Sequence, residues 1–382
     1  MKKKILVTTG TRSEYGILRP LLKKIQQSKK LELLLVVTGT HLSKKHGYTI
    51  NQIKKDGFKI SKKIHMIPKS DENFSMALTL GKGVVDFTKC FRKLKPDVNV
   101  IFGDRDEMLA SALAASHMNI VNAHIHGGDV SGGLDEYNRH AITKISNIHF
   151  AASQKSKKRI LKMGEDKKYV FFTGSPSIDE VKSKKISSKQ KLEKKYQMKF
   201  SGNEILLVQH PVTTESNNAE KQIISTLNAI QRLNCNVIAI SPNSDSGYRK
   251  IFKQLNDFSK KSDNFKLFQN LLREDYLGFL KNVQILVGNS SSGLIEASYF
   301  NTPVIDIGIR QNNRERGPNV LHIKSFSSNL IYQNVERILK KPKKPSLKKT
   351  RIYGDGNAST KIVRILENLT MSDDIIKKQI SY

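Results

Sequence analysis

Short apolar runs alternate with amphipathic stretches along most of the chain. Brief runs rich in Val, Ile and Leu, bounded by Gly, Pro, Ser or Thr, are typical of buried parallel strands. Stretches with apolar residues three and four positions apart are typical of helices that cover a sheet. The alternation therefore predicts βαβ units and an α/β protein with parallel sheets.

The predicted strands form two series, separated by a lysine-rich helical stretch at residues 186–196. The first series comprises residues 4–8, 33–38, 98–102, 120–124, 148–151 and 170–173, with helices such as 16–28 and 107–117 between strands. The second series comprises residues 204–209, 237–241, 265–268, 285–287 and 303–307. Each series can form one doubly wound sheet, so we expect two similar α/β domains.

Turn residues indicate where these domains begin and end. The sequence Thr-Gly-Ser-Pro at residues 173–176 closes the first series, and a charged segment without clear periodicity follows it. We place the boundary near residue 178, which gives a first domain at 1–178 and a second at 179–357. A helical pattern returns at 358–369 after Pro and Gly interruptions. We expect the C-terminal helix, 358–382, to join the first domain.

Length and charge narrow the functional class. A chain of 382 residues is longer than one hydrophobic core comfortably supports, in agreement with two domains. The net charge of +32, from 66 basic and 34 acidic residues, raises the question of nucleic acid. The lysines are scattered, however, and no aromatic stacking platform lies among them. We therefore expect no nucleic-acid partner.

Neither a membrane nor a disulfide framework is expected. No apolar run approaches the ~20 residues that cross a bilayer, and the start of the chain does not resemble a signal peptide. The two cysteines, Cys90 and Cys235, lie far apart and offer no disulfide framework or thiolate metal cluster. We expect a cytoplasmic protein in a reducing setting.

A serine-rich turn at residues 288–296 carries the strongest local signal for function. It connects an apolar run to a helical pattern, so helix-start N–H groups and the hydroxyls of Ser290 and Ser291 converge on one point. Glycines let a ligand approach the backbone, and Glu296 is expected to face the same crevice from the first turns of the helix. The segment predicts a site for a phosphorylated ligand, although an ordinary serine N-cap would also explain it.

Other polar residues follow the predicted strands, where ligands bind in open parallel sheets. The first half contributes Arg12, Asp104, Arg105, His126, Asp129 and Asp135, and the second half contributes His210, Ser290, Ser291, Glu296 and Arg310. Singly, each has a plainer explanation, such as a helix cap for Asp104 or a surface ion pair for Arg310. His124 and His126 share one face of an extended stretch, and a metal site with Asp129 is conceivable. No third strong ligand stands at a suitable spacing, so we expect acid–base groups and no metal.

Taken together and in order, these motifs resemble the hydrolysing UDP-N-acetylglucosamine 2-epimerases. The matching segments are Gly103-Asp104-Arg105, His124-Ile125-His126-Gly127-Gly128-Asp129, Asp135-Glu136, Arg139-His140-Ala141-Ile142-Thr143-Lys144, Gln209-His210-Pro211-Val212-Thr213-Thr214, Gly288-Asn289-Ser290-Ser291 and Arg310-Gln311. They cover nearly the whole chain. The resemblance implies the GT-B architecture, in which two Rossmann-like, doubly wound parallel-sheet domains flank an active-site cleft. It also implies release of UDP and an N-acetylmannosamine-type sugar for sialic or legionaminic acid synthesis, without a cofactor, by a homo-oligomer, either a dimer or a tetramer.

The resemblance also implies roles for the residues. Asp104 and Asp135 match catalytic carboxylates, and Arg105 matches an arginine of the same site. His126 stands where the best-characterised members carry a glutamate, so either His126 or Asp129 is expected to supply the missing acid–base group. The nucleotide-binding side is matched by His210, Ser290, Ser291, Glu296 and Arg310, and Arg12 is expected to help stabilise the leaving group.

Several alternatives stay open on the sequence alone. The sugar could be N-acetylglucosamine or N,N'-diacetylbacillosamine, and the nucleotide could be UDP or GDP. A non-hydrolysing epimerase would return the UDP-sugar, whereas a glycosyltransferase of the same architecture would need an acceptor. A nucleotide-sugar sensor or a polyanion-binding protein without turnover would share the fold but would not need Asp104 and Asp135.

Overall fold

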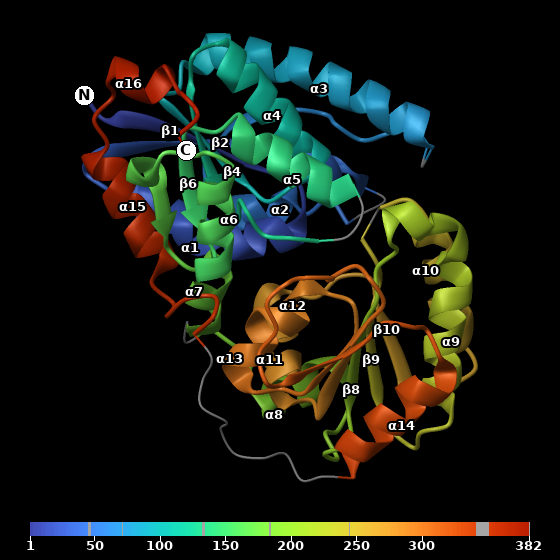
Figure 1. The fold of residues 1–382 in the computed structure, drawn as a ribbon. Helices are drawn as coiled ribbons and strands as arrows, with labels where there is room; N and C mark the ends of the chain where they lie inside the picture. Colours follow the sequence, from blue (N-terminus) through green and yellow to red (C-terminus); the bar gives the residue numbers. More distant parts are fainter. Residues whose placement is uncertain are drawn as a thin grey trace. The chain divides into compact units, whose positions relative to one another are not determined.

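The chain folds into two α/β units (Figure 1). The computed structural model describes residues 1–44, 47–70, 72–131, 134–182, 185–243, 245–340 and 351–381. Contacts group Met1–Asp129, Asp135–Lys182 and Ile352–Tyr382 into unit 1. They group Val130–Leu134 and Ser183–Arg351 into unit 2.

Unit 1 is built on a parallel sheet with the strand order β3-β2-β1-β4-β5-β6-β7. Its strands are β1 Lys3–Thr9, β2 Leu31–Val37, β3 Ile60–Lys63, β4 Val98–Phe102, β5 Val121–Ile125, β6 Ile148–Ala151 and β7 Val170–Phe172. Its helices are α1 Arg12–Gln27, α2 Ile50–Lys55, α3 Asn73–Leu94, α4 Asp106–His117, α5 Leu134–Lys144, α6 Gln154–Lys162, α7 Pro176–Lys182, α15 Ala358–Asn368 and α16 Asp373–Ile376.

Unit 2 repeats the plan with the order β10-β9-β8-β11-β12-β13, again with parallel pairing. Its strands are β8 Ile205–Val208, β9 Val237–Ile240, β10 Phe265–Phe268, β11 Ile285–Gly288, β12 Val304–Ile307 and β13 Val320–Ile323. Its helices are α8 Lys189–Tyr196, α9 Ala219–Gln231, α10 Tyr248–Ser259, α11 Arg273–Asn282, α12 Ser291–Leu294, α13 Glu296–Phe300 and α14 Ser328–Leu339. The predicted fold class, two doubly wound parallel-sheet domains, is confirmed.

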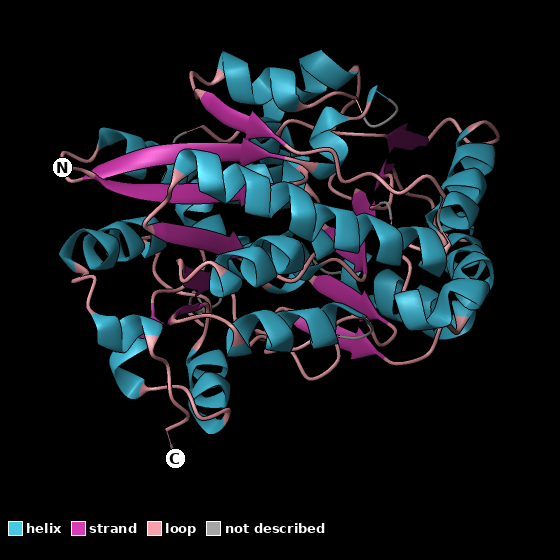
Figure 2. Cartoon of the chain, turned by 90° about the horizontal axis from the view of Figure 1, so that it is seen from above, coloured by secondary structure: helices cyan, strands magenta, loops and turns pink. Residues whose placement is uncertain are grey.

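Helices lie on both faces of the sheets, so the central strands are buried on both sides (Figure 2). Every residue of β4 and β5 is buried, and so is every residue of β8 and β11. The C-terminal helix α15 packs on α1 and α7 in unit 1. Its Ile362, Val363 and Leu366 belong to the same apolar cluster as the strands of the unit 1 sheet. Helix α15 therefore completes the core of the unit in which the chain begins.

The sequence pattern missed β3 and β13, which close one edge of each sheet. β3 carries two exposed lysines at its end, and only Ile323 of β13 is buried. Edge strands need no apolar run on both faces, so their sequences lack the signal that marks the central strands.

In each sheet the strand order reverses once, and this reversal positions the candidate site. In unit 1 the chain moves outward from β1 through β2 to β3 and then returns to β4 on the other side of β1. In unit 2 it moves from β8 through β9 to β10 and returns to β11. The loops after β1 and β4, and those after β8 and β11, therefore diverge and leave a crevice at the carboxyl ends of the strands.

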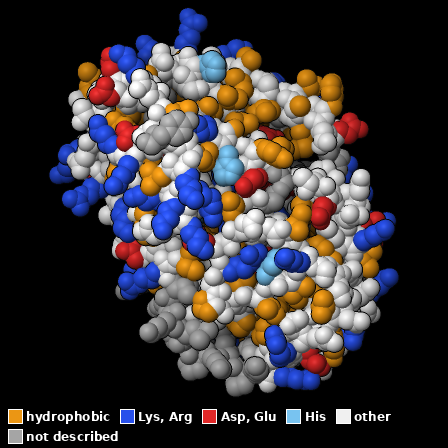
Figure 3. Space-filling view, viewed as in Figure 1, with side chains coloured by type: hydrophobic (Ala, Val, Ile, Leu, Met, Phe, Trp, Pro, Cys, Tyr) orange, Lys and Arg blue, Asp and Glu red, His pale blue; other side chains and the backbone are white. Residues whose placement is uncertain are grey.

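The basic residues form no continuous stripe on the face shown in Figure 3. Lys and Arg side chains gather over α6, whose sequence is Gln-Lys-Ser-Lys-Lys-Arg-Ile-Leu-Lys, and are otherwise dispersed there. Among the described residues, no helix is both long enough and apolar enough to span a membrane.

Candidate active site

The first loop of unit 1 follows β1 and is shaped by Glu14. Thr11 caps α1, and a capping box forms because Glu14 accepts hydrogen bonds from the backbone N–H groups of Gly10 (2.9 Å) and Thr11 (3.1 Å). The predicted site residue Arg12 is therefore fixed as the first residue of α1. Burial, together with the charge of Arg12, lowers the pKa of nearby His41 to about 4, so that imidazole is neutral.

Arg105, after β4, lies between two buried carboxylates. Its Nε atom is 3.3 Å from Glu107 Oε2 and 3.7 Å from Glu14 Oε1. A side chain at Gly39, which has a φ of +55°, would place its Cβ 2.4 Å from Glu107 Oε1, so this glycine makes room for the carboxylate. Burial raises the pKa of Glu14 to about 7, with Arg105 opposing the shift and Glu107 adding to it. The sequence reasoning missed both glutamates, although Glu14 stands at the capping-box position.

Asp104 forms an ion pair with Arg139 of α5. Arg139 is buried, whereas the Asp104 side chain is 18% exposed. Gly103, with a φ of +77°, turns the chain between β4 and Asp104. Asp135 lies one turn before Arg139 in α5 and is half-buried, so α5 carries one predicted carboxylate and the partner of another. Sequence spacing marked Arg139 as a family motif but not as this partner.

His126 and Asp129, the two candidates for one role, are hydrogen-bonded to each other. Their Nδ1 and Oδ2 atoms are 3.0 Å apart, and the other ring nitrogen, Nε2, lies 2.8 Å from Ser175 Oγ. Ser156 donates to the second carboxylate oxygen of Asp129 at 2.6 Å. His126 has a φ of +67°, which is rare outside glycine and asparagine. Such backbone strain persists where the surroundings hold it, often at functional sites.

His124 has a different environment from His126. Its Nε2 lies 2.8 Å from the Gly103 carbonyl oxygen and its Nδ1 lies 3.2 Å from Thr143 Oγ1. Burial lowers the pKa of His124 to about 3, so the imidazole is neutral and supports the loop after β4. No group of three or more His, Cys, Asp or Glu side chains in the described part of the chain is arranged to hold a metal ion.

In unit 2, the turn after β11 crosses close to the end of β8. Gly288 has a φ of +134°, and a Cβ there would lie 2.1 Å from the Val208 carbonyl oxygen. The next residue, Asn289, accepts from the His210 N–H at 2.7 Å and donates to the His210 carbonyl at 2.8 Å. The predicted serine turn and the predicted histidine are thus joined where the strand order reverses.

The serine turn begins a short helix that ends sooner than predicted. Ser290 caps α12, which spans only Ser291–Leu294, and a break at Ile295 separates it from α13. Ser291 is half-buried at the first position of α12. Glu296 is only 2% exposed and pairs with Arg273 of α11, so a neighbouring helix fixes its carboxylate.

Arg310 and His210 are electrostatically linked. Arg310 follows β12, and its Nη1 donates to the Asn289 carbonyl at 3.4 Å. Burial, together with the charge of Arg310, lowers the pKa of His210 to about 3. His210 is therefore neutral, and its Nδ1 accepts the N–H of Asn243 at 3.1 Å. Arg310 can contribute positive charge to an anion, whereas His210 contributes none.

Three buried polar atoms after β8 and β9 have no hydrogen-bond partner among the described residues. They are Gln209 Nε2, Ser241 Oγ and Asn243 Oδ1. Leaving such a group unpaired costs roughly 1–3 kcal/mol, so they point to a polar ligand at this end of the unit 2 sheet.

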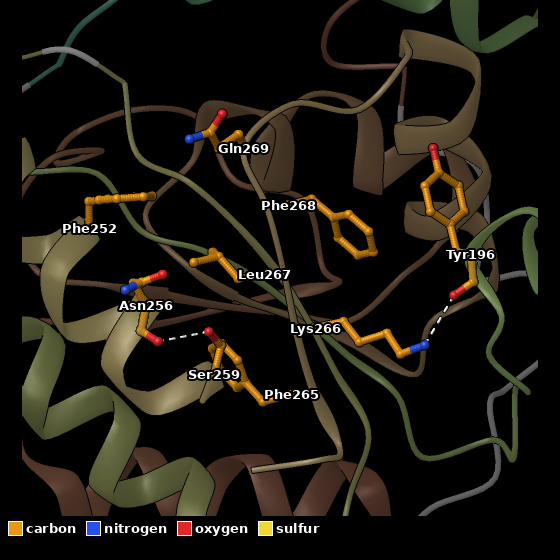
Figure 4. Close-up of a pocket in the computed structure, with 9 residues that line it drawn as sticks. All are labelled: Tyr196, Phe252, Asn256, Ser259, Phe265, Lys266, Leu267, Phe268 and Gln269. Atoms are coloured by element: carbon orange, nitrogen blue, oxygen red, sulfur yellow. Dashed lines mark hydrogen bonds between the residues drawn. The ribbon is translucent and has the colours of Figure 1, made fainter. Parts of the chain in front are cut away.

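A separate open hollow of about 460 Å³ lies along the edge strand β10. Figure 4 shows its lining of mainly apolar side chains, with Lys266 donating to the Tyr196 carbonyl at 3.0 Å. None of the predicted site residues lines it. The convergent polar groups lie at the reversals of the sheets, and the chemistry is therefore assigned there.

Sequence comparison extends this picture to known proteins. The profile described as UDP-N-acetylglucosamine 2-epimerase matches residues 23–367. The chain belongs to this family. It is 37% identical over 382 residues to a protein of Legionella pneumophila named UDP-N,N'-diacetylbacillosamine 2-epimerase (hydrolyzing), and the match covers all of both chains. It is 38% identical to a GDP/UDP-N,N'-diacetylbacillosamine 2-epimerase (hydrolyzing) of Campylobacter jejuni, over 84% of each chain.

Solved structures agree with the fold. The crystal structure of UDP-GlcNAc 2-epimerase from Neisseria meningitidis bound to UDP-GlcNAc matches with a TM-score of 0.78 and 20% identity, over 95% of this chain and 99% of that one. At this identity the likeness shows the fold, and it confirms the predicted GT-B architecture.

Proposed function

We propose that the protein is a hydrolysing 2-epimerase that converts UDP-N,N'-diacetylbacillosamine to UDP and the free 2-epimer of the sugar. Relatives whose names state this reaction match the chain at 37% and 38% identity, one of them over its whole length. The single observation that carries the proposal is the position of the polar groups. In unit 1, Asp104 follows β4 at the strand-order reversal and His126 and Asp129 follow the next strand, β5, and in unit 2 the anion-binding groups lie at the reversal.

The chemistry requires ionisation at C1 before proton transfer at C2. No carbonyl lies beside C2 of an N-acetylhexosamine, so its proton is not acidic in the ground state. As the bond from C1 to UDP lengthens, positive character at C1 acidifies the C2 proton. A base then removes that proton and a 2-acetamidoglucal forms. Water adds at C1, and a proton returns to C2 from the opposite face.

The unit 1 residues have the properties that these proton transfers need. Asp104 is partly exposed and its ion pair with buried Arg139 holds the side chain in place, which suits a base. Asp135 and the His126–Asp129 pair are the candidates for the acid on the second face. Arg105, braced by Glu14 and Glu107, supplies positive charge at the end of β4.

The unit 2 residues suit stabilisation of the departing diphosphate. The N–H groups at the start of α12, the hydroxyls of Ser290 and Ser291, and the Arg310 guanidinium are donors that can face developing negative charge. Each such donor is worth roughly 3–4 kcal/mol of transition-state stabilisation when it is preorganised. Glu296 is assigned to the nucleotide, held in place by Arg273.

The decisive experiment is turnover in deuterated water, followed by NMR. UDP-N,N'-diacetylbacillosamine and UDP-N-acetylglucosamine would be compared, measuring free UDP and the configuration at C2. Release of UDP with a 2-epimer deuterated at C2 would support hydrolytic epimerisation, and the faster compound would identify the sugar. Epimerisation with UDP still attached would move the chain to the non-hydrolysing branch. No reaction with either compound, or with GDP-linked analogues, would contradict the proposal.

The proposal includes a homo-oligomer with α3 as the contact. Its outer face exposes Phe74, Leu78 and Val85, at 72%, 60% and 51%. Gly81 lies on the same face, and a Cβ there would meet nothing within 4 Å of the chain itself. A glycine inside a helix lowers the stability of the helix by about 1 kcal/mol relative to alanine. Close approach of a second copy of the chain would explain why glycine stands at this position. Light scattering of a Leu78→Glu variant should show a smaller particle than the unaltered protein, and an unchanged mass would contradict this assignment.

We also propose a cytoplasmic role in supplying a 2-epimerised amino sugar for nonulosonic acid synthesis. The relatives are named as hydrolysing 2-epimerases, a reaction that would supply such a sugar, and the two buried free thiols suit a reducing setting. Fractionation of cells should place the protein with cytoplasmic markers, and recovery in the membrane fraction would oppose it.

A further inference from the structure

Ser175, a residue with no role so far, is fixed against His126 in unit 1. It precedes α7 and is fully buried, and its Oγ lies 2.8 Å from His126 Nε2. The same oxygen accepts the backbone N–H of Ser177 at 3.2 Å. The backbone N–H of Ser175 donates to the Tyr353 carbonyl at 2.9 Å, so the C-terminal segment also holds this residue.

The opposite side of the imidazole is held by Asp129. A carboxylate oxygen only accepts hydrogen bonds, so the contact of 3.0 Å between Asp129 Oδ2 and His126 Nδ1 places a hydrogen on Nδ1. Ser156 donates to the other oxygen of Asp129, which fixes the carboxylate in turn. The backbone beside Asp129 also packs closely on Ser156, since a Cβ on Gly128 would lie 2.5 Å from the Ser156 carbonyl oxygen.

The hydrogen bonds of Ser175 then indicate whether His126 Nε2 carries a hydrogen. The Ser175 oxygen already accepts from Ser177, and its own hydrogen needs an acceptor. Within the described chain, the only acceptor that contacts the Ser175 hydroxyl is His126 Nε2. Nε2 therefore accepts the hydrogen of the Ser175 hydroxyl, and the ring carries its hydrogen on Nδ1.

We propose that Ser175 is a positioning residue of the active site, which together with Asp129 locks His126 in the Nδ1–H tautomer. A proton that reaches His126 must then enter at Nε2, and the Ser175 hydroxyl must turn its hydrogen away at that moment. Ser175 thus controls when His126 can take a proton. The expected effect of Ser175 on turnover rests on the proposed epimerase function, whereas the tautomer of His126 does not depend on that function.

The tautomer can be measured on the intact protein without substrate. Protein labelled with ¹⁵N-histidine would be examined by long-range ¹H–¹⁵N NMR at neutral pH, with His126 assigned from a His126→Gln variant. His124 serves as an internal reference, because its Nε2 faces a carbonyl and must carry the hydrogen. We expect the two histidines to show opposite tautomers. An Nε2–H or doubly protonated His126 in the unaltered protein would overturn the proposal, whether or not the protein is an epimerase.

A Ser175→Ala variant separates positioning from packing. We expect the ¹⁵N signal of His126 Nε2 to move to that of a nitrogen that accepts no hydrogen bond. We also expect kcat/KM to fall about fivefold, which is the effect of losing one ordinary hydrogen bond, and its pH profile to change. Ser146→Ala is the matched control, since the Ser146 side chain is equally buried but its hydroxyl donates to a backbone carbonyl, that of Ile142, at 2.7 Å. The control should leave the His126 signals and the pH profile unchanged. A Ser175→Ala protein with unaltered His126 signals would refute the role of Ser175. If that variant does not fold, the His126 tautomer of the unaltered protein still tests the proposal.

Discussion

Glu14 should make the stability of unit 1 fall as the pH rises. Burial, reinforced by Glu107 and opposed by Arg105, raises its pKa from 4.5 to about 7. The folded protein therefore binds this proton more tightly than the unfolded chain does. The contribution is fully present below pH 4.5 and is lost as the pH rises through about 7.

The size of the effect follows from the same values. One pKa unit corresponds to about 1.4 kcal/mol, so ionising Glu14 in the folded protein costs about 3 kcal/mol. A Glu14→Gln variant keeps the length of the side chain and an acceptor oxygen for the N–H groups of Gly10 and Thr11, but it carries no titrating proton. We expect the variant and the unaltered protein to have similar stability near pH 4.5, and the variant to be more stable by about 3 kcal/mol at pH 8.

Urea unfolding followed by circular dichroism, at pH values between about 5 and 8.5, would measure this difference. Comparing the two proteins at each pH cancels the other titrating groups. A Glu32→Gln variant is the matched control, because it removes the same charge from an exposed position of β2 and should follow the unaltered protein. Parallel curves for Glu14→Gln and the unaltered protein across the whole range would refute the reasoning.

Three further changes test the site. Asp104→Asn should lower turnover by about 10²–10⁴ while leaving UDP affinity unchanged in calorimetry, and equal loss of both would contradict the assigned role. Arg273→Met should lower the free energy of unfolding by about 3–5 kcal/mol in urea, because the buried Glu296 side chain loses its ion pair with Arg273; a negligible change would show that this ion pair does not stabilise the fold. Gly288→Ala should abolish UDP binding, since its Cβ would lie 2.1 Å from the Val208 carbonyl, and an unchanged Kd would exclude the turn from the nucleotide site.

Much of the architecture was predictable because buried strands carry their own signal. The central strands contain short apolar runs, such as residues 100–102 and 285–287, and the helices between them have a 3.6-residue period, so the fold class followed from the chain alone. The edge strands β3 and β13 were missed because their partial exposure removes that signal. The serine turn was also visible as a strand–helix junction rich in glycine and serine, although the same residues would serve an ordinary N-cap.

The partners within the site were decided only by tertiary structure. Ser175 contacts His126 across 49 positions of sequence, and Arg139 pairs with Asp104 across 35. Spacing predicts contacts only within one helix or strand, where the backbone geometry is fixed. The sequence thus determined which residue types follow which strands. Packing of one βαβ unit on the next determined which of them touch. It therefore decided which carboxylate is ion-paired, which buried carboxyl group has a raised pKa, and which imidazole is held at both nitrogens.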